Sequence, residues 1–142
     1  EDDLRGPQQS EVLAELPSDP RAILQASYAP DLSPLHRFNL SKRAVAALPD
    51  HVGAQSRFAR LALHRDTPAA LAAAQKAASL APWWDAPYYL QAEAFSLLGR
   101  CDEALAALED VRSLIADGQP ARHRRLDATV NETKEKCAEV KQ

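Results

Sequence analysis

The chain has 142 residues, which is enough for one domain with a modest hydrophobic core. Hydrophobic residues make up 46% and charged residues 26%, the balance of a folded protein and not of a disordered one. A net charge of −3 argues against a nucleic-acid binder, which is usually basic, and no apolar run approaches the roughly 20 residues of a membrane span. We therefore expect neither a nucleic-acid partner nor direct membrane insertion by this segment.

The chain begins with the polar run Glu1 to Pro7 and contains no methionine, which suits either a processed terminus or an excised domain. Residues 1–17 are predicted to be a linker that includes a short helix from about Ser10 to Leu16. Arginine is more frequent than lysine and alanine is abundant, which hints at a bacterial source.

Helix starts are marked by a capping residue followed by proline. A cap side chain accepts an unpaired N–H, and proline at the first helical position has no N–H to lose. Asp19, Ser33 and Thr67 stand before prolines, and Asp50 and Asp85 can cap two further helices. Gly99 and Gly118 suit helix C-termini. The helices expected from these signals are 20–29, 34–48, 51–64, 68–80, 86–98, 102–116 and 120–140.

A self-similarity at a spacing of 34 residues joins the central helices. The run 68–71 (Pro-Ala-Ala-Leu) falls on 102–105 (Asp-Glu-Ala-Leu), and 77–80 falls on 111–114. Such a period is typical of helical repeat arrays, in which a unit cannot bury its apolar face alone. The predicted organisation of the domain 18–142 is a degenerate pair at 18–50, repeats at 51–84 and 85–118, and a capping helix at 119–142.

Residues 87–105 resemble the tetratricopeptide repeat (TPR) family. Tyr88 and Phe95 occupy the aromatic positions of the first helix, Ala92 the small position and Gly99 the turn. The 51–84 unit departs from the pattern, because Ala54 replaces the aromatic residue and a phenylalanine fills the small position. The resemblance implies an all-α, right-handed superhelix of antiparallel helix pairs.

The family also implies a concave groove, lined mainly by the first helices, that binds a partner peptide or helix. The residues that match groove positions are Val52, Gln55, Ala59, Ala62, Trp83, Ala86, Tyr89, Glu93 and Ser96. One specialised version of the family clamps a C-terminal carboxylate with lysines and asparagines. Gln55, Ala59 and Leu90 stand at those positions here, so the resemblance does not extend to that clamp.

Motifs of catalysis, metal binding or cofactor binding are not found. The 4 glycines are scattered, and no His-Glu-x-x-His, Cys-x-x-Cys or Gly-x-Ser-x-Gly motif occurs. The 4 histidines fall on separate predicted helices. We therefore expect no enzyme activity, no cofactor and no metal. The basic run 122–125 is interpreted as a solvated face, with docking onto an acidic partner as the alternative.

Cys101 and Cys137 are a candidate disulfide. If the last two helices pack antiparallel about a turn near Gly118, Cys101 lies 17 residues before the turn and faces a residue near position 135. Cys137 is two residues from that position and belongs to the apolar stripe of the last helix. Two unpaired buried thiols are the alternative. A bridge would indicate an oxidising compartment, most simply a bacterial periplasm, and free thiols would indicate the cytoplasm.

Two functions remain open. The first is a scaffold or adaptor that holds a protein partner in the groove. The second is a non-catalytic, periplasmic appendage of an envelope enzyme, because the Ala-Pro-Trp-Trp and Leu-Gly-Arg segments are similar to repeat domains of bacterial glycosyl-polymer ligases. Partner identity and self-association are not specified by either reading.

Overall fold

The computed structural model describes residues 19–141. The helix expected at 10–16 and the linker at 1–17 lie outside this range. Over the described residues the structure is all-helical, without strands, and the predicted all-α fold is confirmed. The helices are α2 (Pro20–Ala26), α3 (Pro34–Ala47), α4 (Val52–Ala62), α5 (Thr67–Leu80), α6 (Ala86–Leu97), α7 (Cys101–Leu114) and α8 (Pro120–Lys141).

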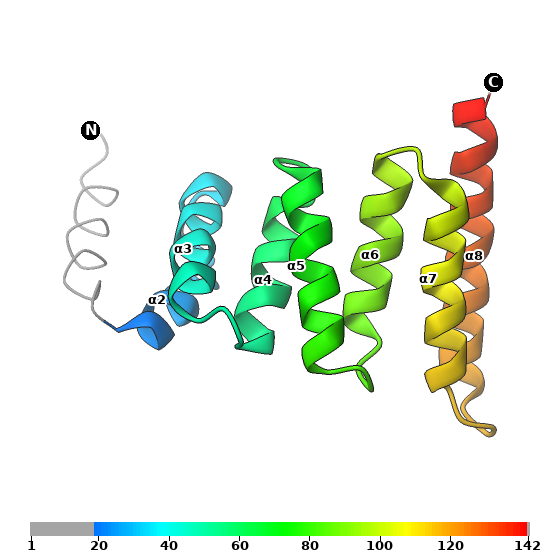
Figure 1. Ribbon diagram of the computed structural model, residues 1–142, viewed down its shortest axis with the longest axis horizontal. Coiled ribbons are helices and arrows are strands. Elements are labelled where there is room, and N and C mark those ends of the chain that lie inside the picture. The colour runs from blue at the N-terminus through cyan, green and yellow to red at the C-terminus, as the bar shows by residue number, and fades with distance from the viewer. Residues whose placement is uncertain (1–18, 142) are drawn as a thin grey trace.

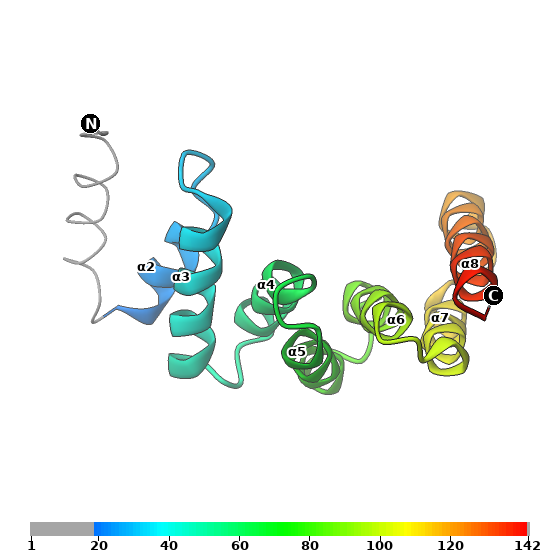
Figure 2. The same ribbon diagram turned by 90° about the horizontal axis from the view of Figure 1, so that it is seen from above.

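The helices form a row of antiparallel pairs, with each helix packed against the next along the chain (Figure 1). Seen from above, α4 and α6 lie in one layer and α5 and α7 in the other, and α8 lies beside α7 on the side of α4 and α6 (Figure 2). Contacts also join α4 to α6 and α6 to α8. The first helices of successive pairs, together with α8, therefore build one continuous face.

Two predicted caps are confirmed. The N–H groups of Arg21 and Ala22 donate to the Asp19 carboxylate at 3.1 and 3.4 Å, and the N–H of His36 donates to the Ser33 hydroxyl at 3.2 Å. Each side chain satisfies donors that the first helical turn leaves unpaired.

Of the other three predicted caps, those of α4 and α5 are wrong by one residue, and Asp85 stands at the N-cap of α6 as predicted but does not cap it with its side chain. Asp66, one residue earlier than expected, caps α5, and Thr67 donates to the Leu63 carbonyl instead. His51 caps α4 through Nδ1, which leaves Asp50 to pair with Lys76. Asp85 precedes α6 without a side-chain capping bond. Its carboxylate binds another helix, as described below.

The two glycines expected at helix ends do have left-handed backbone angles, with φ of 75° at Gly99 and 85° at Gly118. Residues with a Cβ rarely adopt this conformation, so Gly99 closes the last turn of α6 at low cost. Gly118 is not the C-terminus of a helix as expected, because α7 already ends at Leu114 with Ile115 as its C-cap, and it lies in the turn that leads to α8.

The core is divided among the helix pairs and is rich in alanine. Its central cluster lies between α4, α5, α6 and α7 and includes Phe58, Leu71, Leu90 and Phe95. Small residues such as Ala74 and Ala104, both fully buried, let the helices approach closely. A second cluster joins α6 and α7 to α8. The terminal helix is therefore part of the folded core.

None of the helices described over 19–141 is long and apolar enough to cross a membrane.

Candidate functional site

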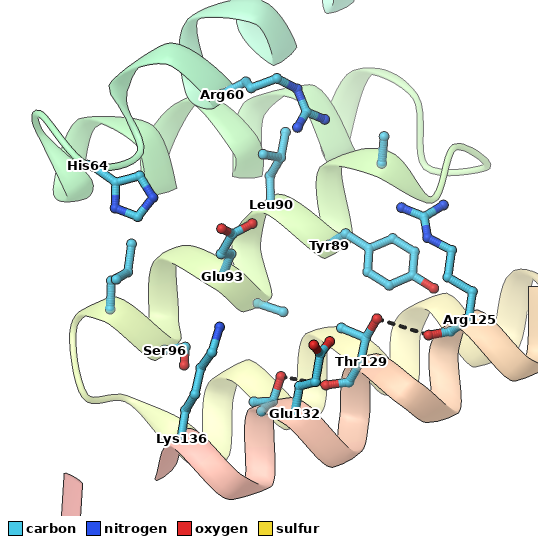
Figure 3. A pocket seen from close by; sticks show the side chains of 14 residues that line it. Arg60, His64, Tyr89, Leu90, Glu93, Ser96, Arg125, Thr129, Glu132 and Lys136 are labelled. Carbon is cyan, nitrogen blue, oxygen red and sulfur yellow. Dashed lines mark hydrogen bonds between the residues drawn. The ribbon is translucent and has the colours of Figure 1, made fainter. Parts of the chain in front are cut away.

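A pocket of about 350 Å³ opens on the continuous face formed by α4, α6 and α8. Tyr89, Glu93 and Ser96 of α6 form its floor, and α8 forms one wall (Figure 3). Arg60 reaches it from α4, and His64 from the turn that follows α4. The lining residues are Arg60, His64, Ala86, Tyr89, Leu90, Ala92, Glu93, Ser96, Leu97, Arg125, Thr129, Glu132, Thr133 and Lys136.

Tyr89 and Arg125 join the floor to the wall. The Arg125 guanidinium carbon lies 4.4 Å from the centre of the Tyr89 ring, which is a cation–π contact. Burial raises the pKa of the Tyr89 hydroxyl above its usual value, while the charge of Arg125 acts to lower it. The hydroxyl is therefore neutral, and it can donate to or accept from a bound group.

Arg122 anchors the start of α8 beside the same pocket. Its Nη2 donates to Oδ2 of Asp85 at 3.0 Å, and its Nη1 donates to the Gln119 side chain at 3.1 Å. Arg122 departs from the interpretation of residues 122–125 as a solvated face, because it is half-buried and pairs with Asp85. Arg125 is exposed as expected, and it also stacks on Tyr89. Only Arg124 of the three arginines is exposed without a contact among the described residues.

Four charged side chains in the pocket make no ion pair within residues 19–141. Arg60 and Lys136 are cationic, and Glu93 and Glu132 are anionic. All four are exposed to solvent. Their hydrogen-bonding capacity is therefore available to a ligand that carries both charged and polar groups.

The structure brings some of the sequence-predicted groove residues together and not others. Ala86, Tyr89, Glu93 and Ser96 all line the pocket. Val52, half-buried at the start of α4, does not line it.

Three more expected groove residues are buried. Ala59 and Ala62 belong to the central core cluster, with exposed fractions of 1% and 0%. Gln55 is also buried, and its amide donates to the Pro49 carbonyl at 2.7 Å. The side chains that reach the pocket from this pair are instead Arg60 of α4 and His64 of the turn after it.

Trp83 lies outside the pocket, with 73% of its surface exposed, and Trp84 is 37% exposed. Neither tryptophan is buried, and Trp83 is therefore not part of the groove in which the sequence places it. Tyr88, next to this segment, is half-buried and donates to the Pro82 carbonyl at 3.1 Å.

The α8 wall is the part of the site that sequence reasoning missed. Arg125, Thr129, Glu132 and Lys136 follow one another at intervals of four, three and four residues, so they share a helix face. This spacing is visible in the sequence. However, it only becomes informative once α8 is known to pack against α6, because a terminal helix is otherwise expected to turn such a face to solvent.

The cysteines come together as predicted. Cys101 and Cys137 form a disulfide with Cα atoms 5.9 Å apart, which joins the start of α7 to the end of α8. Cys137 is buried and directly follows Lys136 of the pocket wall. The bridge therefore holds the C-terminal half of that wall in place.

Within the described part of the chain, no cluster of three or more His, Cys, Asp or Glu side chains is arranged to hold a metal ion.

A scan against protein-family models finds no match, and a search of curated proteins finds none either. Among solved structures, the chain is similar to one described as the crystal structure of MamA protein. The TM-score is 0.74 at 21% identity, over 89% of this chain and 68% of the other. The fold is TPR-like. At this identity the similarity establishes the architecture alone, a superhelix of antiparallel helix pairs as expected from the repeat.

Proposed function

We propose that this protein is a non-catalytic interaction module that binds a segment of a partner polypeptide in the pocket between α4, α6 and α8. The observation that supports the proposal most directly is that side chains of α8 close one side of the face formed by α4 and α6, so that this face contains a pocket. A TPR-like fold offers no chemistry of its own, whereas its first helices present a surface long enough for a peptide.

The lining chemistry supports a peptide in preference to a small apolar ligand. Ligand pockets for small molecules are mostly apolar, with few polar groups. Here Glu93, Glu132, Arg60 and Lys136 line the site together with hydroxyls of Ser96 and Thr129. Tyr89 supplies a rigid aromatic surface at the centre, and such residues contribute disproportionately to binding energy.

The test is selection of binders from a displayed peptide library, followed by fluorescence anisotropy with the selected peptide. The double variant Tyr89→Ala with Glu93→Lys is expected to lose binding while its helical circular dichroism is retained. The matched control, Gln75→Ala with Asp110→Lys, makes the same two kinds of change at exposed positions of α5 and α7. Equal binding by wild type and the Tyr89 variant would move the site elsewhere on the molecule.

We further propose that the protein works in an oxidising compartment such as the periplasm. The pairing of Cys101 with Cys137 supports this location, because disulfides persist there and are rare in the reducing cytosol. The measurement is thiol alkylation and non-reducing mass spectrometry of protein taken from its native cells. Recovery of two alkylated cysteines would place the protein in the cytoplasm instead.

The same disulfide keeps a second candidate function open, that of a soluble repeat domain attached to an envelope enzyme. Such an appendage would bind its partner through the same pocket, without catalysis. Sequencing of the complete gene separates the two candidates. A preceding region with several membrane spans would favour the appendage, and an open reading frame limited to helical repeats would favour the free adaptor.

A further inference from the structure

Three arginines, Arg37, Arg57 and Arg60, gather at the α3–α4 end of the pocket face. Arg57 and Arg60 are three residues apart on α4, so their side chains neighbour each other. The rings of Phe38 in α3 and Phe58 in α4 stack with their centroids 5.9 Å apart, which brings their sequence neighbours Arg37 and Arg57 to the same contact between the helices. Burial lowers the pKa of Arg57, and the charges of Arg37 and Arg60 lower it further. Arg60 also lines the pocket, so the cluster continues the proposed binding site toward the N-terminal pair.

The cluster has no matching carboxylates among the described residues. Arg37 and Arg60 make no ion pair and no side-chain hydrogen bond within residues 19–141. Arg57 donates to the Ser27 carbonyl at 2.6 Å and stacks on the Tyr28 ring at 4.1 Å, but it too has no acidic partner there. Three positive charges are thus held together without compensation.

The hydrogen-bonding capacity of these side chains is also incompletely used. The Nε atoms of Arg37 and Arg57 are buried and have no hydrogen-bond partner. Native proteins satisfy nearly all such groups, so unpaired donors within one cluster of like charge call for an explanation. An anionic group bound by the cluster would not reach these buried Nε atoms, but it would accept from the Nη groups of the same side chains and offset the mutual repulsion.

We propose that Arg37, Arg57 and Arg60 form a subsite that receives the aspartate or glutamate side chains of the bound polypeptide. This inference rests on the proposed peptide-binding function and names the chemistry of the partner. The planar guanidinium fork matches a carboxylate with two parallel hydrogen bonds. Stacking on Tyr28 holds Arg57 in a defined position without using all of its donors.

The other end of the site sets the direction of the bound segment. Between α6 and α8 the pocket carries both signs of charge, with Glu93 and Glu132 beside Arg125 and Lys136. Uncompensated positive charge is found over α3 and α4, so the acidic part of the partner lies there and a part of mixed charge follows over α6 and α8. Because Arg57 also supports the fold through Ser27, Arg37 and Arg60 are the residues to change.

The experiment measures binding of two labelled peptides to the intact chain, one of alternating glutamate and alanine and one with glutamine in place of glutamate. Wild type is expected to bind the glutamate peptide with a clear preference. Arg37→Gln with Arg60→Gln should weaken this binding about ten-fold or more, since each lost charge-assisted pair is worth roughly one decade. Arg43→Gln with Arg124→Gln removes the same charge from exposed positions and should change it less than about two-fold.

Equal weakening by the two double variants would show that general charge attraction is responsible and would overturn the subsite. No preference for glutamate over glutamine, or binding of a phosphoserine peptide but not the glutamate peptide, would overturn it as well. The cluster variant should unfold at the same urea concentration as wild type or a higher one, because repulsion is relieved. If Arg37→Gln alone disturbs folding, the exposed Arg60→Gln variant carries the same comparison.

A peptide selected from the library separates this inference from the proposed function. One outcome is that the double variant Tyr89→Ala with Glu93→Lys loses binding of that peptide while Arg37→Gln with Arg60→Gln retains it. In that case the groove binds polypeptide and the proposed acidic subsite is wrong. If the selected peptide binds wild type and both variants alike, the groove itself is excluded.

Discussion

The guanidinium of Arg125 in α8 lies 4.4 Å from the centre of the Tyr89 ring in α6. This contact makes the terminal helix a wall of the pocket as well as the end of the repeat array. It also explains how a residue from a basic run, which the sequence alone assigns to solvent, becomes part of the site.

Replacement of Arg125 by alanine should therefore weaken both the fold and binding. We expect a loss of about 0.5–1 kcal/mol in the free energy of unfolding, the usual size of an exposed cation–π contact. Tyr89→Phe keeps the ring and should leave stability nearly unchanged. Urea denaturation measures both variants, with Arg124→Ala as the exposed neighbour that lacks a contact. Identical unfolding of the Arg124 and Arg125 variants would argue that the contact contributes nothing.

A double-mutant cycle measures how much the ion pair between Asp85 and Arg122 contributes to the free energy of unfolding. The two side chains are 22% and 39% exposed, so solvent screens the pair and we expect a coupling energy of at most about 1 kcal/mol. The variants are Asp85→Asn, Arg122→Gln and their combination, each followed by urea unfolding. A coupling energy of zero would mean that the pair does not help to seat α8.

Removal of the disulfide should have a larger effect. The bridge closes a loop with a sequence separation of 36, for which the chain-entropy relation gives about 4 kcal/mol. The variant Cys101→Ser with Cys137→Ser is compared with the oxidised wild type by urea unfolding, and reduced wild type is the second reference. Binding should weaken too, because Lys136 and Glu132 lie on the freed half of α8. Unchanged stability on reduction would indicate that packing alone holds this helix.

Phe95→Ala should be among the most damaging single changes. The ring is 6% exposed within the central cluster, so truncation leaves a cavity and should cost on the order of 3–5 kcal/mol. Phe38→Ala is a useful comparison, because Phe38 is only partly buried at the edge of the same cluster and should cost less. The order of the two urea midpoints is the test, and a reversed order would contradict this account of the core.

Gly99→Ala tests backbone conformation without a packing change. A Cβ at this position meets no atom within 4 Å, but the φ of 75° is unfavourable for alanine. We expect a loss of about 1–2 kcal/mol. Gly99→Asn should recover part of it, since asparagine tolerates the left-handed region better. If alanine and glycine give equal thermal midpoints, the turn must have shifted to a right-handed form.

The helices were predictable because their signals are local. Proline after Asp19 and Ser33, glycine at positions 99 and 118, and the apolar period all act within a few residues of the place they mark. The misplaced caps show the limit of such signals. Asp66 and His51 cap their own helices one residue away from the predicted positions, which is within the precision of a local signal. Only Asp85 is decided by another helix, because Arg122 of α8 binds its carboxylate.

The candidate site was predictable only in its α6 part. Ala86, Tyr89, Glu93 and Ser96 share a face whose exposure follows from the well-matched repeat around them. The residues predicted on α4, Ala59 and Ala62, do not line the pocket because their side chains are small. Small side chains allow neighbouring helices to approach until these residues are covered, and a residue's match to a repeat position does not reveal that distance.

The sequence by itself determined the helices, the 34-residue period and the pairing of Cys101 with Cys137, since each depends on spacing along one chain or on a single antiparallel hairpin. Only the tertiary structure decided that Arg125 and Lys136 of α8 line the groove and that Arg60 of α4 lines its other end. Those arrangements depend on the rotation of each helix about its axis against its neighbours. That rotation is set by the packing of many side chains at once, and no local pattern encodes it.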